Sequence, residues 1–273
     1  MNHLLRGLAP FSDAAWQEID REAARTLKTS LGARRVVDFV GPKGWEFAAV
    51  GTGRDRPVPA PDKTKVEARL RHVLPLVELR VPFEMKRSEL DAIDRGARDL
   101  DTDPVIAAAR QIAIAEDHVI FQGYAAAGIR GIAEAQQAQA ISFGDNFAEF
   151  PIAIASAKNK LRDNGVSGPY AVALSEQAYT GLTETTSGGY PVLEHVRHIV
   201  DGPLVWTPGL DGAVVLSMRG GDFELTMGQD FSVGYLDHDA QTVRLYIEES
   251  FTFWLLSAQA AIPLNRQAAP RRR

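Results

Sequence analysis

A period-two alternation of apolar and polar residues constrains the fold of this chain most strongly. The odd-numbered positions from Phe223 to Tyr235 are mostly apolar, and after a polar turn at 237–241 so are the odd positions from Val243 to Leu255. Successive side chains of a strand point to opposite faces, so the pattern predicts a long β-hairpin with one buried face. Each strand would be about twice the usual length of 5–6 residues, which is typical of a structural scaffold.

Composition narrows the possible classes of protein. The chain has 273 residues, is 45% hydrophobic and 24% charged, and carries a net charge of −5 with no cysteine. This composition is that of a globular protein with one large core or two smaller ones. The negative charge argues against nucleic acid as a partner, and the lack of cysteine excludes disulfides and thiolate chemistry. We see no signal peptide in residues 1–11 and no apolar stretch of about 20 residues, so we expect a cytoplasmic protein without membrane contact.

The first third of the chain predicts a helix followed by an extended arm. Ser12 or Asp13 can cap a helix that ends near Gly32, and short strands are expected at 34–40 and 45–50. Residues 51–66 are polar and proline-rich, and the alternation then changes phase across Leu74-Pro75, which predicts a bend. A two-stranded arm with so little of its own to bury is expected to pack on another subunit.

The middle of the chain predicts a long helix and then an inserted α/β unit. The helix starts at 101–104 (Asp-Thr-Asp-Pro) and is expected to run to Ala127. In residues 133–219, helices are expected at 146–162, from Ser175, and through His198, with strands at 170–174, 203–207 and 213–218. The predicted fold class is therefore α+β.

Candidate catalytic groups find little support in the sequence. There is no GxSxG, P-loop, HExxH or dinucleotide-binding glycine motif. His195 and His198 could share a metal, but a solvated helix face beside Glu194 is the favoured interpretation. Composition leaves a Ser-His-Asp triad open without supporting it. Glu249 stands on the apolar face of the last strand, as a buried acid of raised pKa or, as we favour, at a bulge or in an ion pair between subunits.

Several stretches, in order along the chain, carry a resemblance to a known family. They are Leu8 to Asp20, Gly41 to Ala49, Pro75 to Arg80, Glu116-Asp117, Ile120-Phe121, Gly168-Pro169-Tyr170, Arg219 to Asp230, Val243 to Leu245 and Phe251 to Phe253. Together they resemble the shell proteins of encapsulins (family 1, linocin-like), over essentially the whole chain up to Leu264.

The resemblance implies the tailed-phage major capsid protein (Hong Kong 97) fold. Its parts would be an amino-terminal helix with the start of the peripheral domain (1–47), an extended loop (48–74), the peripheral domain with its spine helix (75–132), the axial domain (133–219) and a return hairpin (220–264). Residues 265–273, rich in Ala, Pro and Arg, are expected to be a disordered basic tail.

The resemblance also implies a function without catalysis. Encapsulins form icosahedral shells, here expected from sixty copies, around a cargo enzyme that carries a carboxy-terminal loading peptide. The expected cargo is a dye-decolorizing peroxidase, or less readily a ferritin-like protein, so haem or iron would reside only in the cargo. The alternatives are a phage capsid protein that packages DNA, which the net charge disfavours, and thirdly a protease or bacteriocin-like hydrolase.

The same resemblance implies two sites. The cargo peptide is expected to contact Leu27, Leu31, Arg34, Val36, Asp38, Asp230, Phe231 and Val233, although the apolar members could equally serve only to seat the helix on the sheet. A five-fold pore loop is expected at Thr185, Thr186, Ser187, Gly188, Gly189, Tyr190 and Pro191. Some encapsulins stack a flavin on a tryptophan where this chain has Ser88, so no flavin and no metal are expected in the shell protein.

Overall fold

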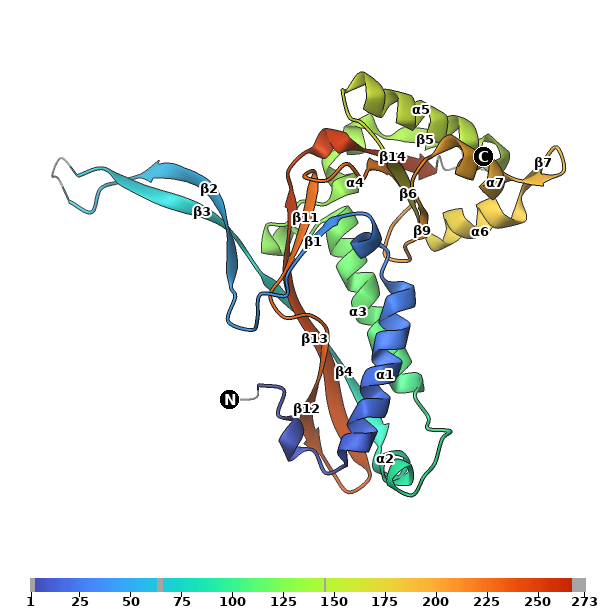
Figure 1. Cartoon of the computed structure of the whole chain (residues 1–273). Coiled ribbons are helices and arrows are strands. Elements are labelled where there is room, and N and C mark those ends of the chain that lie inside the picture. The colour runs from blue at the N-terminus through green and yellow to red at the C-terminus, as the bar shows by residue number, and fades with distance from the viewer. Residues whose placement is uncertain (1–2, 63–65, 145, 267–273) are drawn as a thin grey trace, which may run out of the picture.

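The computed structural model describes residues 3–62, 66–144 and 146–266. It shows an α+β chain with two five-stranded sheets, a hairpin arm that projects from the body, and two long helices that run side by side (Figure 1). Within the described ranges, no helix combines the length and the apolar character needed to cross a bilayer.

The first sheet is organised around one long central strand. Its members are β1 (Asp38–Val40), β4 (Val77–Lys86), β11 (Phe223–Met227), β12 (Ser232–His238) and the 14-residue β13 (Thr242–Leu255). β13 pairs antiparallel with β4 along one edge and with β11 and β12 in succession along the other. The predicted hairpin is confirmed, but the sheet buries both of its faces, because Tyr246, Glu248 and Ser250 are buried opposite the apolar side.

The predicted strand 223–235 is in fact two strands. Met227 pairs with Phe251 and Ser232 with Glu248, so residues 228–231 stand opposite only two residues of β13. Gly228 permits the break, because a Cβ there would lie 2.6 Å from the side chains of Leu76 and Ser250. The extra length bends Asp230 and Phe231 out of the sheet.

Two helices cover the apolar face of the first sheet. They are α1 (Asp13–Ser30), capped by Ser12, and α3 (Asp103–Gln122); the short α2 (Arg87–Asp94) follows β4. Ile19 and Ile112 of these helices pack in one core with Leu245 and Ile247 of β13. The predicted extension of α3 to Ala127 is wrong, because Gly123 has a φ of 85° that ends the helix, and a separate 3₁₀ turn (Ala125–Ala127) follows.

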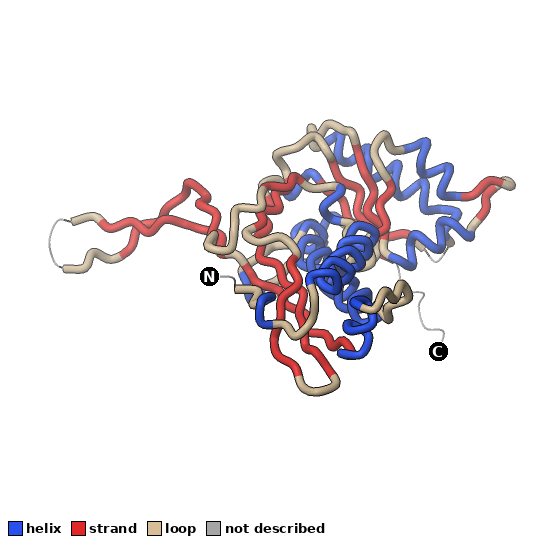
Figure 2. Tube along the Cα trace, turned by 60° about the horizontal axis from the view of Figure 1, so that its bottom comes forward, coloured by secondary structure: helices blue, strands red, loops and turns tan. Residues whose placement is uncertain are grey.

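The predicted arm is present as an isolated hairpin. β2 (Ala49–Val58) pairs antiparallel with β3 (Ala68–Pro75), and the two project together from the body (Figures 1 and 2). The chain bends between Pro75 and Val77, one residue beyond the predicted position. Two expected strands need correction: 45–46 is a turn and 47–48 is irregular, and the segment before β1 is a 3₁₀ helix (Ala33–Arg35).

The second sheet forms the core of the inserted unit. Its order is β5 (Ile141–Phe143), β14 (Ala261–Arg266), β10 (Ala213–Ser217), β6 (Tyr170–Leu174) and β9 (Leu204–Trp206). Four helices accompany it: α4 (Ile132–Ala135), α5 (Phe150–Asp163), α6 (Glu176–Glu184) and α7 (Val192–Ile199). Between α6 and α7, β7 (Thr186–Ser187) and β8 (Tyr190–Pro191) form a small hairpin.

β14 corrects the predicted end of the chain. The stretch predicted as one return segment (220–264) contributes β11 to β13 to the first sheet and then crosses to the second sheet, where β14 pairs with β10 and β5. Asn265 and Arg266, predicted to begin a disordered tail, belong to this strand. The remainder of the predicted tail, 267–273, lies outside the described residues.

Candidate functional site

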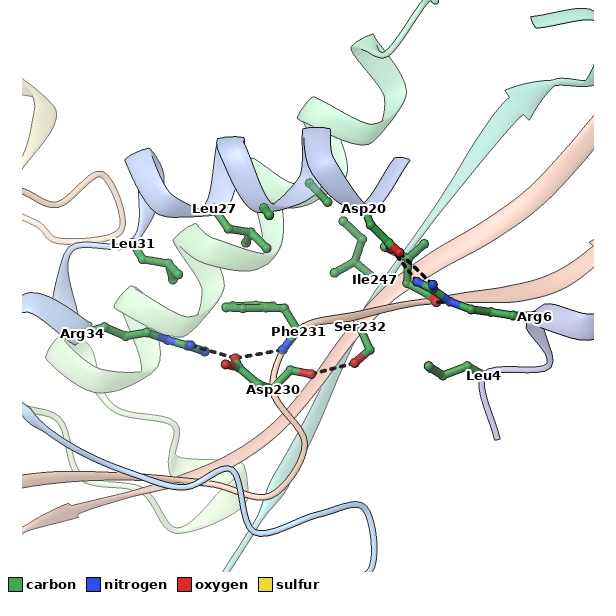
Figure 3. A pocket seen from close by; sticks show the side chains of 13 residues that line it. Leu4, Arg6, Asp20, Leu27, Leu31, Arg34, Asp230, Phe231, Ser232 and Ile247 are labelled. Atoms are coloured by element: carbon green, nitrogen blue, oxygen red, sulfur yellow. Dashed lines mark hydrogen bonds and ion pairs between the residues drawn. The ribbon is translucent and has the colours of Figure 1, made fainter. Parts of the chain in front are cut away.

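A groove of about 610 Å³ lies between α1 and the start of β12 (Figure 3). Its far end is closed by the amino-terminal segment. The residues that line it are Leu4, Arg6, Asp20, Ala23, Ala24, Leu27, Leu31, Arg34, Asp230, Phe231, Ser232, Val233 and Ile247.

The helical repeat of α1 builds one wall of the groove. Asp20, Ala23, Ala24, Leu27 and Leu31 recur at intervals of three and four residues and therefore share one face. The two alanines leave space, and the leucines offer apolar surface. The opposite wall comes from the break in the first sheet, where the main-chain N–H of Phe231 donates to Asp230 Oδ1 at 2.9 Å and fixes the start of β12.

One end of the groove is charged, and the positive charge there belongs to Arg34, which buried carboxylates of the core hold in place. Arg34 donates from Nη1 to Asp230 Oδ1 (2.8 Å), from Nη2 to Glu116 Oε2 (2.6 Å) and from Nη2 to Glu249 Oε2 (3.2 Å). Its guanidinium also lies over the ring of Phe231, 4.5 Å from the centroid. The side chains of Glu116 and Glu249 are fully buried, whereas that of Asp230 is 42% exposed. Asp230 is thus the carboxylate that a ligand in the groove would meet.

Burial sets the protonation of this cluster. Desolvation, followed by the charge of Glu116, raises the pKa of Glu249 well above its ordinary value. Desolvation alone would lower the pKa of Arg34, but the hydrogen bond and charge of Glu116 raise it above its ordinary value. Glu249 is therefore a buried acid of raised pKa that pairs with Arg34 of its own chain and not with another subunit. It also stands opposite the break between β11 and β12, which agrees with the bulge, the other favoured explanation.

The structure brings together six of the eight residues predicted for cargo binding, namely Leu27, Leu31, Arg34, Asp230, Phe231 and Val233. The other two lie elsewhere. Val36 is buried in the core, and Asp38 accepts a hydrogen bond from the N–H of Gly221 at 2.6 Å beside a separate small cavity. Both follow the 3₁₀ turn at residues 33–35, which directs the chain away from the groove.

Comparison with known proteins decides the family. Residues 1–252 match the family described as "encapsulating protein for peroxidase". A type 1 encapsulin shell protein of Rhodospirillum rubrum is 54% identical over 97% of each chain. The chain belongs to the type 1 encapsulin shell proteins. A further encapsulin, from Mycobacterium tuberculosis, is 48% identical over 97% of this chain and 100% of the relative.

Solved structures confirm the predicted capsid fold. A virus-like particle from Pyrococcus furiosus has a TM-score of 0.63 at 14% identity, with 91% of this chain and 98% of that chain covered. A chain of Mycobacterium phage Bobi has a TM-score of 0.59 at 13% identity, with 88% and 91% covered. The encapsulin therefore has the fold of tailed-phage capsid proteins. It is a structural protein that assembles with copies of itself into a shell.

The predicted pore residues of the encapsulin form the β7–β8 hairpin. Gly188 and Gly189 have φ values of 60° and 81°, as a two-residue turn of this kind requires. No side chain from Thr185 to Pro191 carries a charge, and Tyr190 is 67% exposed.

His195, His198 and Ser88 of the encapsulin are not among the residues that line the groove. The ring of His195 lies 6.5 Å from that of Tyr190, and the adjacent Glu194 pairs with Arg197. Among the residues described, no three His, Asp or Glu side chains are grouped as metal ligands would be. Ser88 is exposed in the first turn of α2.

Sequence reasoning missed Leu4, Arg6, Asp20, Ala23, Ala24, Ser232 and Ile247 of the groove. Extending the helical repeat backward from Leu27 would have found the members on α1. Ile247 follows the alternation of β13. Leu4 and Arg6 have no periodic signal, because they belong to a short irregular segment.

Proposed function

We propose that this encapsulin shell encloses a dye-decolorizing peroxidase and that the groove binds a carboxy-terminal loading peptide of that enzyme. The proposal rests on the groove, which offers apolar side chains from two walls and an exposed carboxylate at Asp230. Extended peptides bind such grooves through alternate apolar side chains and charged contacts at their ends. The description of the matched family, which names a peroxidase, supports this cargo over a ferritin-like protein.

The rest of the proposal concerns the assembled particle. Sixty copies form the shell in the cytoplasm, and the β7–β8 hairpins surround its five-fold pores. Haem belongs to the cargo, and the shell protein holds neither flavin nor metal. A DNA-filled capsid is the second candidate, and a nuclease-resistant excess of absorbance at 260 nm in purified particles would favour it.

The decisive experiment compares cargo content in shells of two variants. Phe231→Ala removes the aromatic floor of the groove, and we expect the haem absorbance per shell to fall strongly. Ile152→Ala is the matched control, because Ile152 is 68% exposed on α5, outside the groove-lining residues. Equal haem content in both variants would contradict the groove as the cargo site, and iron without haem would favour the ferritin-like cargo.

A further inference from the structure

The amino-terminal segment, residues 3–8, lies along the outer edge of β12. The main-chain N–H of Tyr235 donates to the carbonyl of Leu4 at 2.9 Å, and Arg6 Nε donates to the carbonyl of Val233 at 2.8 Å. Both bonds use main-chain groups of β12 at alternate residues, which face away from β13. The segment therefore closes the edge of the strand and forms a third wall of the groove (Figure 3).

Arg6 joins this third wall to the other two. Its Nη1 and Nη2 donate to the two carboxylate oxygens of Asp20 on α1, at 2.8 and 2.5 Å. The guanidinium lies over the ring of Trp16, also on α1, 4.4 Å from the centroid. Together with the bond to Val233, these contacts use the planar fork of arginine in three directions, which a lysine cannot reproduce.

The backbone shows that the segment is held in place from both sides. Leu5 has a φ of 52° and a ψ of 21°, in the left-handed region. A residue other than glycine there is strained and keeps this conformation only where its surroundings impose it. Leu5 is 44% exposed, so the bonds of Leu4 and Arg6 on either side impose it. Further back, His3 stacks on Trp45 with a centroid separation of 4.0 Å.

We propose that Arg6 is the positioning residue that sets the width of the groove. It ties α1 to β12 through one guanidinium and keeps the two walls at a fixed separation before any ligand binds. A site formed in advance loses less conformational entropy on binding, so its width selects the side chains that enter. This inference rests on the proposed binding of a cargo peptide in the groove.

The width can be measured directly, because the chain has no native cysteine. We would attach nitroxide labels to Lys28→Cys on α1 and Leu236→Cys on β12. Both positions are exposed and lie outside the lining of the groove. Double electron–electron resonance spectroscopy then measures the distance between the two labels of one subunit, in shells that contain few labelled subunits. We expect one narrow distance in the otherwise native protein, a longer and broader distribution in Arg6→Ala, and an intermediate one in Arg6→Lys.

The control is Arg21→Ala, which removes an arginine of α1 that is 70% exposed and pairs with Glu18. It should leave the narrow distance unchanged. If Arg6→Ala or Arg6→Lys also leaves the distance unchanged in closed shells, the inference is overturned, whatever happens to cargo. If Arg6→Ala shells do not close, the label distance in Arg6→Lys shells decides whether the inference holds.

The haem content of the same shells separates the inference from the function on which it rests. We expect a widened groove to hold about tenfold less cargo when cargo is limiting, because a groove that must be ordered on binding loses about 1.4 kcal/mol of affinity, which is a factor of ten. A longer label distance with full haem content would support the role of Arg6 in the groove and contradict the groove as the cargo site.

Discussion

Arg34 and Glu116 meet through three nitrogen–oxygen contacts of 2.6 to 2.9 Å, one residue in a 3₁₀ turn and the other in the middle of α3. The pair lies at the boundary between the core and the groove. Glu116 holds the guanidinium from inside, and Asp230 contacts it from the groove. The charged end of the groove is therefore as rigid as the core behind it.

Replacing Arg34 should destabilise the protein strongly. Arg34→Met leaves Glu116 and Glu249 buried without their cation, and breaking a buried pair of this kind costs about 3–5 kcal/mol. Denaturant unfolding of the variant at neutral pH measures the loss. Arg35→Met is the control, since the neighbouring Arg35 is exposed. A loss below about 1 kcal/mol would show that the buried carboxylates do not need Arg34.

Asp117 should make stability depend on pH. Burial raises its pKa from 3.8 to about 7, although the amides of Ala33 and Gly32 donate to it and lower the value. The folded state then binds the proton more tightly than the unfolded state, so this residue's contribution to the free energy of unfolding falls as pH rises from about 4 to about 7 and is level above. Asp117→Asn cannot titrate and should lose this slope.

Thermal unfolding of the variant and the native shell across this range tests the expectation. Asp163→Asn, at the exposed end of α5, should keep the native profile. Parallel profiles for the native protein and Asp117→Asn would mean that another group carries the dependence.

The two aspartates predicted for cargo binding should differ in effect. Asp230 lines the charged end of the groove. Asp38, in β1, lies outside the groove and accepts a hydrogen bond from the N–H of Gly221. We expect Asp230→Lys to abolish co-purification of the cargo and Asp38→Lys to leave it in place. Loss of cargo in Asp38→Lys, with intact shells by electron microscopy, would extend the peptide path beyond the groove.

The β7–β8 hairpin should control entry of small molecules. Gly188→Val and Gly189→Val place side chains in open space but strain a backbone of positive φ. We expect slower turnover of enclosed peroxidase, with free peroxidase as the reference. Gly165→Val is the matched control, since Gly165 has a φ of 74° and open surroundings at the end of α5. Unchanged turnover in the hairpin variants would argue against a pore at this place.

The arm should be needed for closure of the shell. It exposes apolar side chains such as Leu70 and Val73, which have no core of their own. Replacing residues 54–64 by a Gly-Ser segment of equal length should give open or smaller assemblies. Electron microscopy of particles with unchanged diameter would contradict a contact between subunits through this arm.

Elements with a local sequence pattern were predicted correctly, whereas those that depend on contacts between distant residues were not. The alternation found β13 and the β3 strand of the arm, because period-two patterns are local. It missed the break after Met227, because four residues opposite two leave the odd–even phase unchanged. It missed β14, whose short apolar run pairs with strands far away in the sequence. In the groove, the wall formed by α1 could be predicted from the periodicity of that helix. The contact between Arg6 and Val233 joins residues 227 positions apart and leaves no local pattern.

The position of β14 has a consequence for synthesis on the ribosome. This strand lies between β5 and β10 in the interior of the second sheet, yet it is translated after every other strand of both sheets. A nascent chain that has emerged only through β13 has β5 without its neighbour and an open edge on β10. The unit that carries the β7–β8 hairpin therefore cannot complete its sheet until both sheets' other strands have been translated, and the subunit becomes competent for assembly only after β14 has emerged.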